Sequence, residues 1–301
     1  MASLRARLVY DVLMPLLRSK HRYDATMSVD TLRATARAPA VAPKQSATVR
    51  IGREQCRGHA LYRLSPPTGE PRHRLFYLHG GAFVNPITRY HWKLLTWLVA
   101  RLRAEIVVPM YPLAPRVSIE NMVPVIEDIH EQVTAGGCYG LIGDSAGAYL
   151  TLALARRLRQ RDRLRAPSLV LISPCLDLAL GDPRSQAIDA RDPMLNLAGA
   201  RRVLSLAAAP RAPDDAALNL LREGLDGLPA MLALAGSRDI LYPDTGHLAA
   251  AVRAAGGDIE VLEGPGMAHV WPLLPVPEAS AARQAIAAFI ERYGDSLTAA
   301  G

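Results

Sequence analysis

Short apolar runs and longer amphipathic stretches alternate along most of the chain. An uninterrupted run of Val, Ile and Leu predicts a buried strand, because a parallel sheet covered on both faces needs apolar side chains on both. Turn-forming residues bound many of these runs. The runs that predict strands are 47–51, 58–64, 75–78, 105–110, 139–142, 168–173, 231–235 and 258–262.

Between these runs, apolar residues recur with helical spacing. The stretches that predict helices are 90–102, 119–134, 148–161, 242–255 and 278–293, with two further candidates inside 184–215, where no strand is expected. Strand and helix alternate from residue 75 onward, and repeated strand–helix units imply a mainly parallel sheet with helices on both faces. The predicted fold class is therefore α/β.

Residues 1–23 carry an apolar stripe of their own, formed by Leu4, Leu8, Val12 and Leu16. Pro15 should kink or end this helix, and Asp11 and Pro15 interrupt the apolar stretch, which argues against a signal peptide. No segment reaches the roughly 18 apolar residues that span a membrane. We expect the helix to pack against the body of the protein; a mobile helix over a substrate entrance and a transient contact with a membrane surface are the alternatives.

The composition is that of an ordinary globular protein. The 301 residues are 50% hydrophobic and 21% charged, which allows a sizeable core. The formal net charge of +7 could favour nucleic acid or anionic lipid as a partner. However, nearly all basic residues are scattered arginines, and the densest run, 156–165, ends a predicted helix, where cations complement the dipole. No aromatic residues lie within it, so we expect no nucleic-acid partner.

The three cysteines, Cys56, Cys138 and Cys175, are odd in number and widely spaced. They form neither a disulfide framework nor a metal-binding pattern. Cys138 and Cys175 adjoin apolar runs and are expected to be small buried residues. Free thiols favour a reducing compartment, so we expect a cytoplasmic location.

A candidate nucleophile stands in the segment Gly143-Asp144-Ser145-Ala146-Gly147. The pattern is G-x-S-x-G, with a predicted strand before it and a predicted helix after it. In that setting the serine lies on a sharp strand-to-helix turn that only small neighbours permit. The helix N-terminus supplies free N–H groups and a partial positive charge, which would stabilise an oxyanion. A glycine-rich turn with an incidental serine is the alternative.

A serine hydroxyl needs a base, and the base needs a third group that holds its tautomer. His269 lies in a loop just after the last predicted strand, and Asp239 follows the strand at 231–235. Loops at the carboxyl ends of parallel strands gather at one edge of the sheet, where sites form. The order Ser145, Asp239, His269 is also the order found in α/β hydrolases. Asp244 is a competing acid, but it fits better in the first turn of the next helix.

A second glycine-rich loop, His79-Gly80-Gly81-Ala82, follows the predicted strand at 75–78. Consecutive glycines let backbone N–H groups point into a cavity that a Cβ would block. We expect the N–H groups of Gly80, Gly81 and Ala82 to hold a tetrahedral oxyanion, together with the N–H of Ala146. Losing one such donor costs about 3 kcal/mol in other enzymes.

These motifs resemble those of the hormone-sensitive-lipase-like branch of the α/β-hydrolase esterases. The loop at 79–82 is similar to its H-G-G-[GA] motif, and residues 143–147 match its G-D-S-A-G motif. Further similar segments follow in order: Tyr111-Pro-Leu-Ala-Pro115, Asp192-Pro-Met-Leu195, Asp239-Ile-Leu241 and Gly266-Met-Ala-His269. The likeness covers residues 70–293. It implies an α/β-hydrolase fold with a small helical cap, and Ser145, Asp239 and His269 as a catalytic triad.

The resemblance also implies a division of the chain. Residues 1–45 would form an N-terminal cap segment and linker, 46–183 and 223–301 the hydrolase core, and 184–222 a cap insertion. Ala82 stands where the family usually has a third glycine, and Pro112 and Ala148 replace a common arginine and a common glycine. None of these departures removes a catalytic group.

The predicted function is a serine carboxylester hydrolase that acts on small or short-chain acyl esters through an acyl-enzyme intermediate. An amidase or deacetylase with the same triad is an alternative, because both reactions pass through the same tetrahedral oxyanion. A non-catalytic ligand-binding protein on this scaffold is another, although such proteins typically lack a triad residue. No metal or organic cofactor is expected, since no ligand spacing or phosphate-binding loop occurs. The oligomeric state stays open, a homodimer included.

Overall fold

One mixed sheet organises the protein in the computed structural model, which describes residues 2–16, 20, 23–34, 38–135, 137–222 and 224–294. Its strands are β1 (Arg50–Cys56), β2 (His59–Ser65), β3 (His73–Leu78), β4 (Ala104–Pro109), β5 (Gly140–Asp144), β6 (Leu169–Ile172), β7 (Met231–Gly236) and β8 (Ile259–Gly264). Their order across the sheet is β1-β2-β4-β3-β5-β6-β7-β8. β1 and β2 are antiparallel to their neighbours, and the strands from β4 to β8 are parallel. The predicted α/β class is confirmed.

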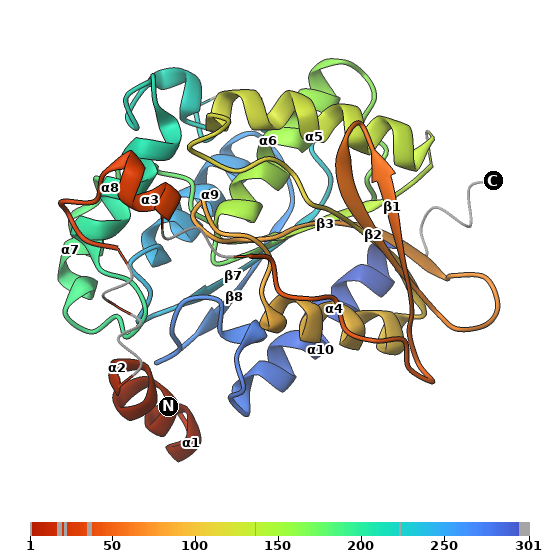
Figure 1. Ribbon diagram of the computed structural model, residues 1–301, viewed down its shortest axis with the longest axis horizontal. Coiled ribbons are helices and arrows are strands. Elements are labelled where there is room, and N and C mark those ends of the chain that lie inside the picture. The colour runs from red at the N-terminus through yellow and green to blue at the C-terminus, as the bar shows by residue number, and fades with distance from the viewer. Residues whose placement is uncertain are drawn as a thin grey trace.

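Helices cover both faces of this sheet, as predicted. The longer ones are α4 (Arg89–Leu102), α5 (Ile119–Thr134), α6 (Ala146–Gln160), α9 (Tyr242–Ala254) and α10 (Glu278–Gly294). Figure 1 shows α5 and α6 on one face of the sheet and α4 and α10 on the other. Each lies within a few residues of a stretch with helical spacing.

Two apolar cores, one on each face, explain the uninterrupted apolar runs. Within β3, Leu75 and Tyr77 pack in one core, whereas Phe76 and Leu78 pack in the other. Successive side chains of a strand point to opposite faces, so a strand covered on both sides needs apolar residues at every position. Each such fully buried side chain contributes about 1.5–3 kcal/mol.

The first strand is displaced from its predicted position. The apolar residues at 47–51 predict a strand there, but β1 begins at Arg50 and continues to Cys56. Most of its side chains are exposed, because β1 is one edge of the sheet and pairs only with β2. An edge strand does not need a continuous apolar run, so its extent is not visible in the hydrophobic pattern.

The N-terminal helix consists of α1 (Leu4–Arg7), a π-helical stretch η1 (Leu8–Leu13) and α2 (Met14–Leu16). The π-helix precedes Pro15, whose ring would clash with the carbonyl four residues earlier in a regular α-helix. The N–H of Met14 accordingly donates to the carbonyl of Val9, five residues back.

This helix packs against the body, as expected, but the predicted apolar stripe does not make the contact. The buried side chains are instead Ala6, Val9, Tyr10 and Met14. The stripe of Leu4, Leu8, Val12 and Leu16 faces solvent. Helical spacing alone identifies two apolar faces here and does not say which one the body covers.

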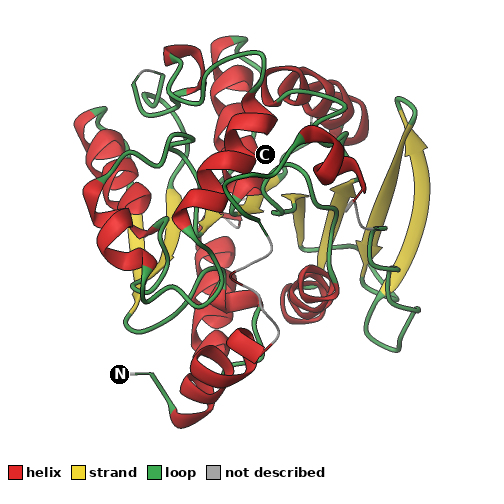
Figure 2. Ribbon diagram, turned by 60° about the vertical axis from the view of Figure 1, so that its left-hand side comes forward, coloured by secondary structure: helices red, strands yellow, loops and turns green. Residues whose placement is uncertain are grey.

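Three shorter helices gather on one side of the molecule: α3 (Val29–Ala34), α7 (Pro183–Asp189) and α8 (Leu197–Ala208). Figure 2, in which this side comes forward, shows helices in front of the strands. Two hydrogen bonds tie the N-terminal segment to the start and middle of α8. Asn196 donates to the carbonyl of Tyr23 at 2.9 Å, and Arg202 donates to the carbonyl of Met27 at 2.6 Å.

The cysteines correct one expectation. Cys175 is buried, as predicted, but Cys138 is exposed. It lies in the loop before β5, outside the sheet, so its apolar neighbours in sequence do not cover it. Among the helices that the structure describes, none has the length and apolar character needed to cross a bilayer.

Candidate active site

Ser145 stands at the junction of β5 and α6, on a strained turn. Its backbone has φ 54° and ψ −121°, a conformation that costs an L-residue on the order of 1–3 kcal/mol. Gly147 permits the turn, because α6 lies directly against β3. A Cβ at Gly147 would stand 2.0 Å from the carbonyl oxygen of Leu78. The local geometry is thus the one that G-x-S-x-G predicts.

His269 and Asp239 reach this turn from the loops after β8 and β7. The Nε2 atom of His269 lies 2.9 Å from Oγ of Ser145, and its Nδ1 atom lies 2.7 Å from Oδ2 of Asp239. In the neutral tautomer that fits these contacts, Nδ1–H donates to the carboxylate and Nε2 accepts from the hydroxyl. The structure therefore brings together the three side chains singled out in the sequence.

The surroundings of His269 favour its charged form. Burial by itself lowers the pKa of the imidazole, but the adjacent carboxylate of Asp239 outweighs burial, so the pKa of His269 is raised above its ordinary value. An imidazole of raised pKa is a stronger proton acceptor. It is suited to take a proton from a neighbouring hydroxyl.

Backbone hydrogen bonds fix the two loops to each other. The N–H of Arg238 donates to the carbonyl of Met267 at 2.9 Å, and the N–H of Gly266 donates to Oγ of Ser237 at 2.8 Å. On the far side of His269, the N–H of Val270 donates to the Ser173 hydroxyl after β6. The imidazole is therefore positioned by three loops and does not depend on its own loop alone.

Two further buried carboxylates lie near Asp239. Asp244 is in the first turn of α9, as predicted, and accepts from the N–H groups of Leu176 and Asp177 instead of contacting His269. Burial raises the pKa of Asp244 to about 7. The competing acid thus supports the loop after β6.

Asp192 holds the loop that carries Asp239. Its carboxylate accepts from the N–H groups of Met194 and Leu195 and, at 2.9 Å, from the N–H of Ile240. Burial, together with the charge of Asp239, raises the pKa of Asp192 to about 6. Asp192 lies in the Asp192-Pro-Met-Leu195 segment singled out in the sequence. In the structure, this segment anchors the loop that carries Asp239.

The glycine-rich loop after β3 faces Ser145 with a strained backbone. Gly81 has φ 132°, and Ala82 and Phe83 have φ 54° and 63°. A Cβ at Gly81 would stand 2.4 Å from the carbonyl oxygen of Asn85. Within the described residues, no acceptor is found for the N–H groups of Gly81, Ala82 and Ala146. The N–H of Gly80, in contrast, donates to Oδ1 of Asp144 at 3.0 Å, so this predicted oxyanion donor is already engaged.

Asp144 joins this loop to the serine turn, and the sequence reasoning missed it. Its buried carboxylate accepts from the N–H of Gly80 and from the hydroxyl of Tyr77, and it lies 3.2 Å from Nε2 of His91. Burial would raise the pKa of Asp144, but the attraction of His91 and these hydrogen bonds outweigh burial and lower it. The carboxylate of Asp144 is therefore held ionised directly beside Ser145, the candidate nucleophile.

His91 and His79 are also supporting residues. His91 forms a capping box with Thr88 at the start of α4, which turns its Nε2 toward Asp144. The ring of His79 stacks on Tyr111, with 4.5 Å between ring centroids, and the Tyr111 hydroxyl donates to the His79 carbonyl. Burial lowers the pKa of His79 to about 4, so this imidazole stays neutral.

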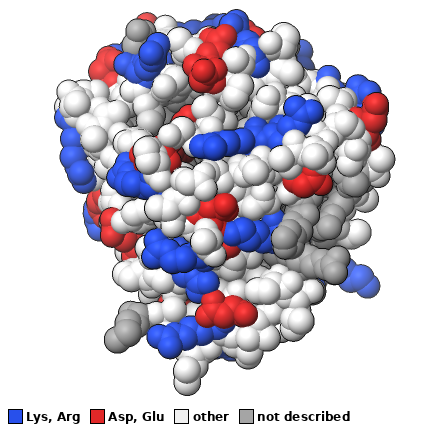
Figure 3. Space-filling view, turned by 90° about the vertical axis from the view of Figure 1, so that its left-hand side faces the viewer, with Lys and Arg blue, Asp and Glu red and all other residues white. Residues whose placement is uncertain are grey.

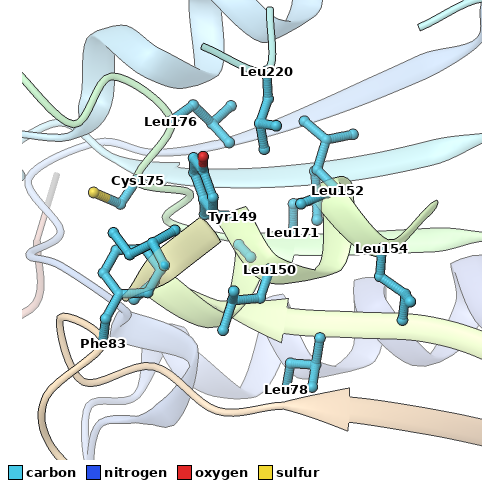
Figure 4. Packing of buried hydrophobic residues seen from close by; sticks show 14 of the residues in the cluster. Leu78, Phe83, Tyr149, Leu150, Leu152, Leu154, Leu171, Cys175, Leu176 and Leu220 are labelled. Atoms are coloured by element: carbon cyan, nitrogen blue, oxygen red, sulfur yellow. The ribbon is translucent and has the colours of Figure 1, made fainter. Parts of the chain in front are cut away.

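Apolar side chains from several segments pack against one another (Figure 4). Tyr149 and Cys175 join this cluster to the serine turn, because their N–H groups donate to the carbonyl of Ser145. Phe83 follows β3, Tyr149 lies one turn into α6, and Leu176 follows β6. Phe83 and Tyr149 meet edge to face with centroids 5.5 Å apart, and the Tyr149 hydroxyl donates to the carbonyl of Leu218. Apolar side chains therefore lie on one side of Ser145, which is itself half-buried.

A separate pocket of about 330 Å³ lies between the N-terminal helix and the segment 190–193. Its lining residues include Tyr10, Lys20, Arg191 and Arg238, but none of Ser145, Asp239 and His269. Within the described residues, no group of three or more His, Cys, Asp or Glu side chains is placed to hold a metal ion.

A parallel sheet with a nucleophile turn, an acid loop and a histidine loop at one edge defines the α/β-hydrolase class. The chain belongs to that family: the alpha/beta hydrolase fold family matches residues 75–273. Within it, the chain falls in the hormone-sensitive-lipase-like branch of esterases and lipases. The predicted fold and the predicted branch are both confirmed, and the prediction of an esterase- or lipase-like hydrolase agrees with the relatives.

Two relatives and one solved structure illustrate the similarity. An esterase of Acinetobacter venetianus is 33% identical over 179 residues, which are 57% of this chain and 58% of the esterase. An acetyl-hydrolase of Streptomyces hygroscopicus is 30% identical over 72% of this chain and 76% of its own length. The chain thus spans less than two thirds of the first of these relatives. The crystal structure of a hormone-sensitive lipase from a metagenome library shares the fold, with a TM-score of 0.79 and 22% identity over 93% of this chain and 97% of that one.

Proposed function

We propose that the protein is a serine carboxylester hydrolase whose triad is Ser145, His269 and Asp239. The observation that carries the proposal is the continuous path of contacts from the Ser145 hydroxyl through the imidazole to the buried carboxylate, 2.9 Å and 2.7 Å long. A nucleophile, a base and an orienting acid within hydrogen-bonding distance are the parts that acyl transfer requires.

In the proposed reaction, Nε2 of His269 takes the hydroxyl proton while Oγ of Ser145 attacks the acyl carbon. The tetrahedral intermediate collapses when the imidazolium returns the proton to the leaving alcohol oxygen, which leaves an acyl-enzyme. Water then attacks the acyl carbon with the same base, and the carboxylic acid departs. Asp239 stabilises the imidazolium in both steps.

The N–H groups of Gly81, Ala82 and Ala146 are proposed to hold the oxyanion. Gly80 is left out of this set, because its N–H donates to Asp144. Its proposed part is indirect: the bond to Asp144 fixes the glycine-rich loop against the serine turn. Preorganised backbone donors of this kind stabilise a transition state because they do not have to reorient during the reaction.

Short acyl groups are the proposed substrates. The side chains of Phe83, Tyr149 and Leu176 are packed together beside the serine turn, which limits the space for an acyl chain. The similarity to an acetyl-hydrolase points in the same direction. The residues at 1–45 and 184–222 are proposed to form the cap over this site, supported by the hydrogen bonds from Asn196 and Arg202 to the N-terminal segment.

The test is an activity profile on p-nitrophenyl esters from acetate to decanoate, with Ser145→Ala beside the wild type. We expect hydrolysis to be fastest with the shortest chains, and Ser145→Ala to lower kcat on the order of 10⁴-fold or more. Ser280→Ala, at an exposed position of α10, is the matched control and should leave kcat unchanged. Equal rates for Ser145→Ala and wild type would refute the triad.

The same preparation separates the alternatives. A fluorophosphonate probe should label wild type and the Ser280→Ala control but not Ser145→Ala. A folded wild type that is not labelled would instead favour a non-catalytic binding protein. Faster turnover of p-nitroacetanilide than of p-nitrophenyl acetate would favour an amidase.

A further inference from the structure

The N-terminal helix exposes an apolar surface that the rest of the described chain does not match. Leu4, Leu8, Val12 and Leu16 have exposed fractions of 85%, 53%, 45% and 74%, and Leu13 beside them has 45%. These five residues are the N-terminal stripe. Elsewhere among the described residues, Val41 alone is a large hydrophobic side chain of comparable exposure. Large apolar side chains gathered on one helix mark an interaction surface, whereas single ones are ordinary.

The helix cannot bury the stripe by rolling, because its opposite face is anchored. Tyr10 is fully buried, and its hydroxyl contacts the sulfur of Met267 in the histidine loop. The N–H of Ser3 donates to Glu278 at 2.6 Å, and Arg238 forms an ion pair with Asp11 at 2.7 Å. The contacts lie along the helix, so the stripe is held outward.

Charges around the stripe are mainly positive. Arg5 and Arg7 of α1 are exposed and have no ion-pair partner among the described residues, whereas Asp11 is neutralised by Arg238. The pocket on the body side of the helix adds Arg191, whereas Lys20 in the same pocket is paired with Asp189 at 3.4 Å. Figure 3 faces this side of the molecule and shows uncharged surface at its foot, with basic and acidic side chains nearby. An apolar face bordered by basic residues is the pattern of a helix that lies in a lipid interface.

We propose that the N-terminal stripe docks on an anionic phospholipid surface. The helix would lie along the surface, with the leucines among the acyl chains and Arg5 and Arg7 at the phosphates. Charge complementarity favours this occupant over a second copy of the chain, since self-association through the stripe would bring two arginine-bearing helices together. The inference does not rest on the proposed function, because docking can be measured without turnover.

Docking would also place the candidate site close to lipid. The helix contacts the loop that carries His269 through Tyr10 and Met267, and Arg238 precedes Asp239 directly. A docked helix fixed to this loop would hold the edge of the sheet that carries Ser145 and His269 near the lipid. Apolar esters dissolved in the lipid would then reach the site directly.

The experiment is co-sedimentation with large unilamellar vesicles, made of phosphatidylcholine alone or of equal parts phosphatidylglycerol and phosphatidylcholine. Leu4→Ser/Leu8→Ser/Leu16→Ser removes the apolar contact, and Arg5→Gln/Arg7→Gln removes the charge. Val41→Ser is the matched control, because it removes an equally exposed apolar side chain elsewhere. Circular dichroism and the thermal midpoint are measured for every variant, since the buried face of the helix is untouched and all should fold.

We expect wild type and Val41→Ser to bind the phosphatidylglycerol vesicles, and to bind phosphatidylcholine more weakly. The leucine variant should lose binding by at least about tenfold, and the arginine variant by about thirtyfold on anionic vesicles only. Equal sedimentation of the wild type and the leucine variant would overturn the proposal. So would a wild-type dimer in light scattering that the leucine variant abolishes, because a second copy would then cover the stripe.

Discussion

Protonation of one imidazole should set the pH at which Ser145 can act. His269 must be neutral to accept the hydroxyl proton, and its pKa is raised because Asp239 outweighs the effect of burial. For the wild type, kcat/KM should therefore rise with pH and reach half its plateau above about 6.5, the ordinary histidine value. The measurement is the pH profile of kcat/KM on p-nitrophenyl acetate.

Asp239→Asn supplies the second half of that prediction. In this variant the imidazole is still buried, but the attraction of the Asp239 carboxylate for the imidazolium is lost. The pKa of His269 should therefore fall, and the acid limb of the kcat/KM profile should move to lower pH. The plateau should drop on the order of 10⁴-fold, because the correct tautomer is no longer held. An acid limb that stays at the wild-type pH would show that another group controls it.

At the scale of the residue, the sequence identifies chemistry that stands in short motifs and misses chemistry that depends on contacts. Ser145, Asp239 and His269 each follow a predicted strand, so their meeting at one edge could be foreseen. In the sequence, Asp144 stands out only as part of the serine motif, because its partners Gly80 and His91 belong to other elements. The same contact removes Gly80 from the free N–H groups, which no local pattern could indicate.

At the scale of the element, the close approach of α6 to β3 leaves no room for a side chain at Gly147. Gly147→Ala would place a Cβ 2.0 Å from the carbonyl oxygen of Leu78. The atoms in the way are backbone atoms of Leu78 and His79, which cannot rotate aside as a side chain could. The helix must therefore move as a whole, and we expect a loss of about 3 kcal/mol or more in the free energy of unfolding. Urea unfolding measures it.

Gly246→Ala is the matched control for this prediction. Gly246 lies in α9, is exposed, and a Cβ there meets nothing within 4 Å. Alanine is the better helix former, so this variant should gain about 0.5–1 kcal/mol. Two variants of equal stability would mean that the contact between α6 and β3 is looser than the structure shows.

Element positions are visible in the sequence where both faces of an element are buried, and become uncertain at the edges. The strands from β3 to β7 follow mainly apolar runs, whereas β8, at the other edge of the sheet, carries Glu260 and Glu263 among its apolar residues. The predicted bounds of all six strands differ from the observed ones by a few residues at most. The edge strand β1 is misplaced and α3 is not predicted at all, because mostly exposed elements lack such a signal. The N-terminal helix was expected, but the π-helical stretch before Pro15 and the choice of buried face follow from tertiary contacts.

At the scale of the whole molecule, four buried groups oppose one another in how stability depends on pH. The pKa values of His79 and His130 are lowered by burial to about 4, so these residues bind protons only in the unfolded chain between about pH 4 and 6.5. Asp192 and Asp244, raised by burial to about 6 and about 7, hold protons only in the folded protein over much of the same range. Stability rises with pH where the unfolded state binds more protons. The contributions of the two histidines and of the two aspartates to the pH dependence of stability have opposite signs and nearly cancel. The wild type should therefore be almost equally stable at pH 4.5 and 6.

Asp244→Asn should break this balance. The amide can still accept from the N–H groups of Leu176 and Asp177, as the protonated acid does, but it does not titrate. In the wild type, the folded protein retains the proton of Asp244 while the unfolded chain loses it above about pH 3.9, so this group makes stability fall with rising pH. In the variant, only Asp192 still opposes the rise of stability with pH that the two histidines cause. The free energy of unfolding of the variant should then rise, relative to wild type, by about 1.4 kcal/mol for each pH unit between pH 4.5 and 6.5. Urea unfolding at several pH values measures both slopes, and parallel slopes for the two proteins would mean that Asp244 is ionised in the folded state throughout this range.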